Sequence, residues 1–155
     1  MKKIKGLKCK ECGEQSPAIA KHVCEFCFGP LEVEYDYEFI RAAVTKEKIL
    51  SRPRTLWRYW EFLPVETQDV VSLHEGCTPF WKSRNLGKLL GLKNLYFKND
   101  SVNPTFSFKD RVVTVALTRS RELGFDTVAC ASTGNLAGSV AAYGAVGGFK
   151  TFVFI

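Results

Sequence analysis

The pattern of apolar and polar positions along the chain changes character near residue 71. Residues 1–35 contain one alternating stretch, at positions 31–35, which predicts a short β-strand. Beyond residue 71, segments with a helical period alternate with short apolar runs. The predicted helices cover residues 110–123 and 135–146, and the predicted strands cover residues 94–98, 127–131 and 150–155. Strands that alternate with helices pair in parallel, so this part predicts an α/β fold with an open parallel sheet in three αβα layers.

The segment between these two parts has a weaker pattern and is interpreted as a connector over residues 36–70. Residues 38–50 are weakly helical, and Pro53 breaks that pattern. Residues 56–64 then bring several tryptophan, tyrosine and phenylalanine side chains close together. Because aromatic side chains dominate buried contact area, we expect this stretch to dock onto the part that begins at residue 71.

The composition is that of a globular protein, with 46% apolar and 25% charged residues in 155. Its longest apolar runs are far shorter than the ~20 residues that cross a bilayer. The first residues also lack the apolar core of a secretory signal. We therefore expect a cytoplasmic protein with no membrane contact. The net charge of +6 is spread without a run of like charges, which favours scattered solvated positions over a nucleic-acid site.

Cysteine spacing gives the strongest local signal in the first part of the chain. Two Cys-x-x-Cys pairs follow one another, Cys9 with Cys12 and Cys24 with Cys27. Each pair turns two thiolates toward one ion, and two pairs supply the four soft ligands of a tetrahedral zinc site. Two disulfides would need an oxidising compartment, and a redox pair would lie at the N-terminus of a helix, which neither pair does. The spacing therefore predicts a zinc ribbon over residues 1–35, stabilised mainly by its metal.

Two loops beyond residue 71 carry the residue types of a chemical site. In residues 103–111, Asn-Pro-Thr-Phe-Ser-Phe-Lys-Asp-Arg, Ser107 can cap the following helix and Lys109 is a candidate nucleophile at its start. In residues 131–135, Ala-Ser-Thr-Gly-Asn, hydroxyls and free N–H groups meet a helix N-terminus, which suits a carboxylate or a phosphate. Each loop alone is more often a solvated helix start or a capping turn. Together we expect them at the carboxyl ends of neighbouring strands, facing one cleft.

These residues resemble those of a known family. Residues 103–111 are similar to the cofactor-lysine motif of the fold-type II pyridoxal-phosphate enzymes, and most similar to that of the threonine synthases. Residues 132–135 resemble the substrate-carboxylate loop of those enzymes. Residues 72–80, Ser-Leu-His-Glu-Gly-Cys-Thr-Pro-Phe, resemble the Gly-Glu-Gly-x-Thr-Pro-Leu segment that introduces their catalytic domain. The zinc ribbon and residues 56–59 also look like one branch of this family, so the resemblance covers essentially the whole chain.

The resemblance implies a role for each matching residue. Lys109 would bind pyridoxal 5′-phosphate covalently and then move protons at the substrate carbons. Asn135 would hydrogen-bond the 3-hydroxyl of the cofactor ring, and Ser132, Thr133 and Gly134 would hold the carboxylate of the amino acid. The implied reaction converts O-phosphohomoserine, a phosphorylated small molecule, and water into threonine and phosphate. A homodimer is the assembly expected for the full-length form.

The sequence departs from the family pattern at three positions. His74 and Phe106 stand where glycine is common, and Phe80 stands where leucine is usual. Phe106 is expected to narrow the space around the lysine, and Asp110 and Arg111 are expected to support the loop. The glycine-rich loop that holds the cofactor phosphate lies, in the family, further along the chain. We therefore expect this chain to be the amino-terminal portion of a longer enzyme and to be inactive alone.

Two other functions are compatible with the sequence. Within the same fold, a serine/threonine dehydratase or another β-replacement enzyme shares these motifs. In a different class, the four paired cysteines and the charge of +6 suit a zinc-ribbon nucleic-acid-binding or scaffold protein. Residues 71–155 lack the interleaved aromatic and basic residues of a stacking platform, which favours the enzyme and no nucleic-acid partner.

Overall fold

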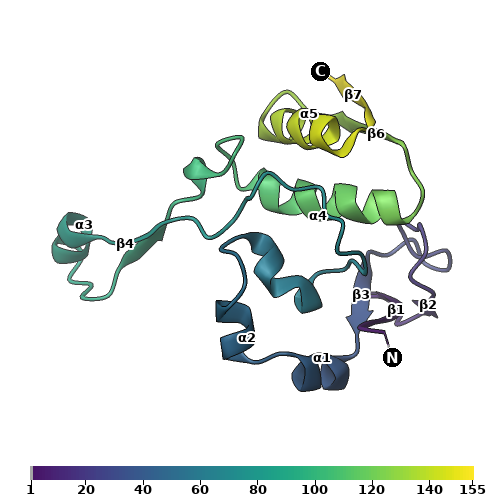
Figure 1. Cartoon of the computed structure of the whole chain (residues 1–155), viewed down its shortest axis with the longest axis horizontal. Helices are drawn as coiled ribbons and strands as arrows, with labels where there is room; N and C mark the ends of the chain where they lie inside the picture. The colour runs from purple at the N-terminus through teal and green to yellow at the C-terminus, as the bar shows by residue number, and fades with distance from the viewer. Residues whose placement is uncertain (1) are drawn as a thin grey trace.

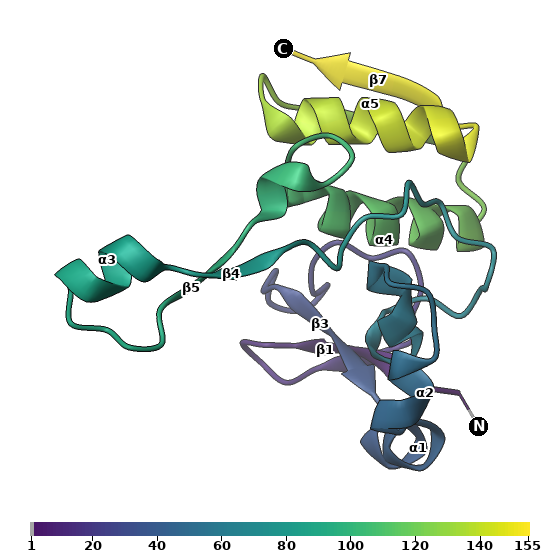
Figure 2. The same cartoon turned by 60° about the vertical axis from the view of Figure 1, so that its left-hand side comes forward.

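The structure, a computed structural model, describes residues 2–155. Helix α4 (Lys109–Glu122) crosses the middle of the molecule, with the amino-terminal sheet and the connector on one side of it (Figure 1). Helix α5 (Asn135–Gly147) and a pair of parallel strands lie on the other side. A third group of elements extends away from this body as an arm (Figure 2). None of the helices in residues 2–155 has both the length and the apolar character needed to cross a membrane.

The amino-terminal part is a three-stranded antiparallel sheet in the order β2-β1-β3. Its strands are β1 (Ile4–Cys9), β2 (Gln15–Ser16) and β3 (Leu31–Tyr35). Strand β3 confirms the predicted alternation, and it pairs with β1 so that Leu7 faces Val33. Strand β1 was not predicted, because lysines interrupt its short apolar pattern. Its pairing with β3 places Cys9, at its end, in a buried position.

The connector consists of three short helical elements. They are α1 (Tyr37–Ala43), α2 (Lys46–Leu50) and the 3-10 helix η1 (Leu56–Phe62). The single weak helix predicted over residues 38–50 is thus two helices. They separate because Val44 is extended and the Thr45 hydroxyl accepts a hydrogen bond from the Lys48 N–H (3.2 Å), which caps α2.

The aromatic stretch of the connector does dock onto the following part, as the sequence predicts. The Trp57 Nε1–H group donates to Glu75 Oε1 (2.8 Å) and lies 3.2 Å from Thr114 Oγ1 on α4. Trp60 joins the connector to the amino-terminal sheet, since the fully buried Lys3 Nζ donates to its carbonyl oxygen (2.6 Å) and lies 3.4 Å from its ring centroid. Burial lowers the pKa of the Lys3 ammonium to about 8.

The part beyond residue 100 confirms the predicted α/β alternation. Strands β6 (Thr127–Ala131) and β7 (Lys150–Phe154) pair in parallel, with α5 as the connection between them. The core forms where α4 meets α5, from the buried side chains of Val71, Val113, Leu117, Val140 and Tyr143. On β7, Phe152 and Phe154 are 54% and 63% exposed, so within residues 2–155 a helix covers only one face of this strand pair.

The sequence did not predict the arm. It contains β4 (Phe80–Lys82), α3 (Arg84–Leu89) and β5 (Tyr96–Lys98), and it is followed by the 3-10 turn η2 (Asp100–Val102). The expectation that residues 94–98 belong to the parallel sheet is wrong, because β5 pairs antiparallel with β4. Helix α3 and the turn after it return the chain alongside β4, where Trp81 faces Phe97 and the rings of Phe80 and Tyr96 stack 4.8 Å apart.

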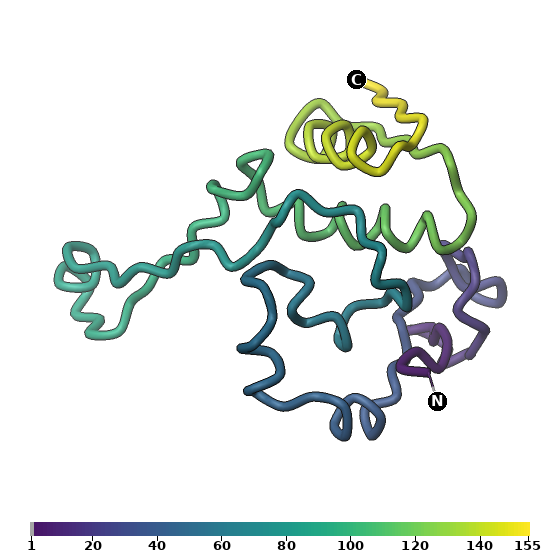
Figure 3. The backbone as a smooth tube through the Cα atoms, in the orientation of Figure 1, coloured from purple at the N-terminus to yellow at the C-terminus, as the bar shows by residue number. Residues whose placement is uncertain are grey.

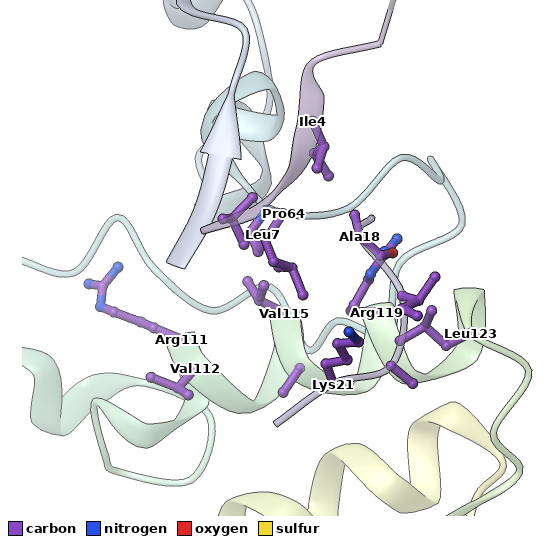
Figure 4. A pocket seen from close by; sticks show the side chains of 14 residues that line it. Ile4, Leu7, Ala18, Lys21, Pro64, Arg111, Val112, Val115, Arg119 and Leu123 are labelled. Carbon is purple, nitrogen blue, oxygen red and sulfur yellow. The ribbon is translucent and has the colours of Figure 1, made fainter. Parts of the chain in front are cut away.

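A cavity of about 520 Å³ lies between the amino-terminal sheet and α4 (Figure 4). Its wall is mainly apolar and includes Ile4, Leu7 and Val115. At one side Arg119 donates to the Ala18 carbonyl oxygen (2.6 Å), which ties the sheet to the helix. The wall includes neither Lys109 nor any of residues 131–135. The cavity is therefore a gap in the packing between the amino-terminal sheet and α4, and not part of the candidate site.

Gly144 is required by the close packing of α5 on β7. A Cβ at this position would overlap with Thr151 Oγ1 and lie 3.2 Å from Thr151 Cβ and Cγ2. Gly144→Ala should therefore lower the free energy of unfolding by about 1–3 kcal/mol. Gly138 lies in the same helix, and a Cβ at that position would meet no neighbouring segment within 4 Å. Gly138→Ala should raise the free energy of unfolding by up to about 1 kcal/mol. Equal effects of the two substitutions in urea unfolding would contradict the close packing of Gly144 on Thr151.

Candidate functional site

The loop that precedes α4 holds Lys109 by its backbone and leaves its side chain free. Ser107 Oγ accepts a hydrogen bond from the Lys109 N–H (3.1 Å), so Ser107 caps the helix as predicted. The Thr105 N–H donates to Asp110 Oδ2 (2.8 Å), which folds the loop back onto the helix. Within residues 2–155 the half-buried Lys109 has no hydrogen bond to its Nζ, which lies 4.9 Å from the Phe108 ring centroid. The backbone of Lys109 is thus held in place, while its amine is available to react.

Two departures from the family pattern coincide with unusual backbone. His74 and Phe106 have φ values of +64° and +60°, in the left-handed region that favours glycine. Glycine, which the family resemblance leads us to expect at both positions, would adopt these φ values without strain, whereas His74 and Phe106 mark both turns as locally strained. The Phe106 side chain is 79% exposed, and its expected effect on the space around Lys109 stays a prediction.

An ion pair closes the base of the lysine loop. Arg111 on α4 donates from Nε and Nη2 to the two carboxylate oxygens of Asp100 (both 2.8 Å), and from Nη2 to Thr78 Oγ1 (3.1 Å). This geometry confirms that Arg111 supports the loop. The hydrogen bonds from Arg111 lower the pKa of the Asp100 carboxyl to about 2 and raise the pKa of the Arg111 guanidinium.

The Asp100 pair makes stability depend on pH in a defined direction. Because the folded pKa lies below the ordinary 3.8, the contribution is complete above about pH 4 and is lost as the pH falls through about 2. Asp100→Asn should lower the free energy of unfolding at pH 6 by about 1–2 kcal/mol, after allowance for partial exposure. The difference from the unmodified chain should shrink between pH 4 and 2 in guanidinium unfolding.

Asp100 is not the only acid that titrates in this pH range. The hydrogen bond from Arg52 lowers the pKa of the Glu61 carboxyl to about 2 as well, so the unmodified chain also loses stability through Glu61 as the pH falls toward 2. A control substitution is therefore needed. Asp69 pairs with Arg121 and its side chain is 82% exposed, so Asp69→Asn should change stability very little. A stability difference for Asp100→Asn that stays constant from pH 6 to pH 2 would show that the ion pair does not cause it.

The second loop lies at the carboxyl end of β6. The Ser132 N–H donates to the Phe154 carbonyl oxygen (2.9 Å), which extends the β6–β7 ladder, and Ser132 Oγ accepts from the Gly134 N–H (3.2 Å). Thr133, Gly134 and Asn135 are exposed, and no side chain among residues 2–155 caps the N-terminus of α5. The free N–H groups of this helix start therefore face solvent beside two hydroxyls, which is an arrangement that binds carboxylates.

The helices that follow the two loops are joined close to their starts. Asp110, next to Lys109, accepts a hydrogen bond from Ser139 Oγ on α5 (2.7 Å), and Ser139 lies one turn after Asn135. Both helices begin on the same side of the molecule (Figures 2 and 3). The predicted reason for this proximity is wrong, because the lysine loop follows the arm and not a strand beside β6.

Two buried residues of this region were not identified from the sequence. Asn103 is 2% exposed, and its side chain accepts from the Gly76 N–H (3.1 Å) and donates to the Asp100 carbonyl oxygen (3.0 Å). Glu75 is fully buried beneath both helices. Both lie within the motifs that carry the family resemblance, which was the only signal that they matter.

The four paired cysteines converge on one point. The Sγ atoms of Cys9 and Cys27 lie 3.4 Å apart, those of Cys12 and Cys24 lie 3.7 Å apart, and all four lie within 4.8 Å of one another. A tetrahedral zinc site with Zn–S bonds of about 2.3 Å needs sulfurs about 3.8 Å apart. The Cys12 N–H points at the Cys9 sulfur and lowers the pKa of the Cys9 thiol to about 7. These side chains fit zinc.

Comparisons with known proteins agree with this geometry. Residues 71–155 match the family described as pyridoxal-phosphate dependent enzyme. A threonine synthase of Methanocaldococcus jannaschii is 48% identical over 150 residues, which are 96% of this chain and 37% of that protein. A threonine synthase of Methanosarcina acetivorans is 44% identical over 150 residues, 96% of this chain and 36% of that protein. One from Halalkalibacterium halodurans is 46% identical over 101 residues, 64% of this chain and 28% of that protein. The chain thus spans somewhat more than a third of the length of the first two.

Proposed function

Because the chain belongs to the family of pyridoxal-phosphate dependent enzymes, we propose that it forms the part of a threonine synthase that carries the cofactor lysine. One observation supports this most directly: a hydrogen bond from Ser139 to Asp110 joins α4 next to Lys109 with α5, whose uncapped N-terminus follows Ser132, Thr133 and Gly134. The choice of reaction within the family rests on the relatives, which are named threonine synthases.

In this proposal each residue acts through the geometry described above. The free Lys109 amine binds the cofactor aldehyde and afterwards moves protons at the substrate carbons. Ser132, Thr133 and Gly134 bind the substrate carboxylate with hydroxyl and N–H groups, and Asn135 orients the cofactor ring through its 3-hydroxyl. The bound pyridoxal phosphate supplies an electron sink for substrate carbanions. The protein supplies position and hydrogen bonds.

We assign the remaining parts of the chain as follows. Residues 1–35 form a zinc ribbon in which Cys9, Cys12, Cys24 and Cys27 hold a structural zinc ion. Residues 36–70 connect it to the cofactor-binding part, residues 71–155. The partner is a phosphorylated amino acid and not a nucleic acid, and the enzyme acts in the cytoplasm, as a homodimer in its full-length form.

The proposed reaction is tested in a chimera in which this chain replaces the matched segment of the M. jannaschii threonine synthase. We expect O-phosphohomoserine to be converted to threonine with release of inorganic phosphate. Deamination of serine or threonine, without turnover of O-phosphohomoserine, would instead support the dehydratase. An exchange that leaves the host enzyme folded, by circular dichroism, but inactive toward all three substrates would contradict both.

A further inference from the structure

Glu75 is a fully buried acid whose hydrogen-bond partners are all uncharged. Its Oε1 receives Trp57 Nε1–H (2.8 Å), and its Oε2 receives the Leu73 N–H (3.0 Å) and the Tyr143 hydroxyl (2.9 Å). The Ser72 hydroxyl lies within 3.2 Å of both oxygens. The Glu75 side chain thus joins the connector, the turn that immediately precedes Glu75, and α5. Burying an acid in this way is costly unless it is fully hydrogen-bonded, so the site indicates a specific use.

Glu75 also reaches α4 and completes a polar ladder between the two helices. The Thr114 hydroxyl lies 2.9 Å from Glu75 Oε1 and 2.6 Å from the Val71 carbonyl oxygen, and its single hydrogen serves one of them at a time. One rung of the ladder runs from Thr114 through Glu75 to Tyr143. The other rung joins Asp110 to Ser139, one turn earlier on each helix. Because the rungs are four residues apart on both helices, a slip of either helix breaks both.

The ladder ends where the proposed site begins. Lys109 precedes Asp110, and Asn135 lies one turn before Ser139, so the register of the ladder sets the distance between the amine and the substrate loop. Resting on the proposed function, we propose that Glu75 is the positioning residue that holds Lys109 opposite residues 132–134. It touches neither cofactor nor substrate in this role. It acts through the placement of α4 against α5.

Glutamine at this position disrupts the Thr114–Glu75–Tyr143 rung with almost no change in volume. Oε1 faces the Trp57 N–H and Oε2 faces the Leu73 N–H, and neither donor can become an acceptor. Whichever way the amide of Glu75→Gln is turned, its NH₂ group meets an N–H group. Glu61 offers a matched control, since it is also buried, at 3% exposure, but it pairs with Arg52 in the connector, away from both helix starts.

The first test uses the 155-residue chain and does not depend on its activity. In hydrogen exchange read by mass spectrometry, Glu75→Gln should speed exchange at Leu73 and in the turns of α4 and α5 that contain Thr114 and Tyr143, where the N–H groups are bonded within the helices, by about tenfold or more. Glu61→Gln should leave these turns unchanged. Exchange in these turns that is the same in the unmodified chain and Glu75→Gln overturns the inference, whether or not the proposed reaction occurs.

The second test uses the chimera and separates positioning from folding. Per mole of bound cofactor, Glu75→Gln should lower kcat about 10- to 100-fold with KM within about threefold, because the reacting groups are misplaced and not lost. Tyr143→Phe, which removes one donor and keeps the ring, should give a smaller loss. A Glu75→Gln chimera that is less stable but has unchanged kcat overturns the inference, whereas an unmodified chimera without activity overturns the proposed function alone.

Discussion

Lys109→Ala should abolish the long-wavelength absorption band of protein-bound pyridoxal phosphate in the chimera and lower kcat by at least about a thousandfold. The reason is specific to this lysine. Its backbone N–H is bonded to Ser107, its amine has no hydrogen bond within residues 2–155, and its helix is joined to α5 by the Asp110–Ser139 hydrogen bond. Absorbance and initial-rate measurements on the same sample give both results.

A matched change separates this effect from the loss of any positive charge. Lys150 lies at the start of β7, at the opposite end of the strand pair from residues 132–134, and Lys150→Ala should keep both the band and the rate. Added methylamine should restore part of the activity of Lys109→Ala, since a small amine can take over proton transfer in the space left by the side chain. Retention of the band in Lys109→Ala would remove Lys109 from the proposed role.

Removal of zinc should unfold residues 1–35 while residues 71–155 stay folded. A module with strands of six, two and five residues buries too little apolar surface to fold alone. Zinc bound by four thiolates contributes about 10–16 kcal/mol to such modules near pH 7. Chelation should therefore make the cysteines of both pairs reactive toward a thiol reagent and free Arg119 from the Ala18 carbonyl oxygen. Hydrogen exchange should report the loss of β1–β3 protection.

Single cysteine changes identify the ligands. Cys24→Ser should lower the bound zinc, measured by elemental mass spectrometry, from one ion per chain to a small fraction. Cys77→Ser should leave it unchanged, because the Cys77 sulfur lies near Arg58 and the Thr55 carbonyl oxygen and not in the cysteine cluster. Full zinc content in Cys24→Ser, or four paired cysteines that stay unreactive after chelation under reducing conditions, would contradict a structural zinc site.

Local signals in the sequence predicted the elements whose formation depends on nearby residues. The helix expected over residues 110–123 is found at Lys109–Glu122, and the strand expected over residues 127–131 has these bounds. The cysteine spacing likewise predicted the cluster, because a Cys-x-x-Cys turn is a local geometry. In each case the sequence pattern and the observed packing point to the same structure.

Features that depend on distant contacts were not predictable in the same way. Residues 96–98 have the pattern of a strand, but only the return of the chain through α3 decides that they pair with β4. Glu75 is an acid in a short polar turn, and nothing local indicates that four segments will close over it. The sequence singled out the two candidate loops, whose site roles stay predictions, but it did not predict the Asp110–Ser139 hydrogen bond that joins the helices after them.

Chemical trapping tests the central claim, that Lys109 is the cofactor lysine, most directly. Pyridoxal phosphate is added to the chimera, the bond between lysine and cofactor is reduced with borohydride, and the pyridoxyl group is located by peptide mass spectrometry. We predict one dominant site, Lys109, which is lost in Lys109→Ala without a new site of equal yield. Dominant labelling of any other lysine, with Lys109 unmodified, would contradict the assignment.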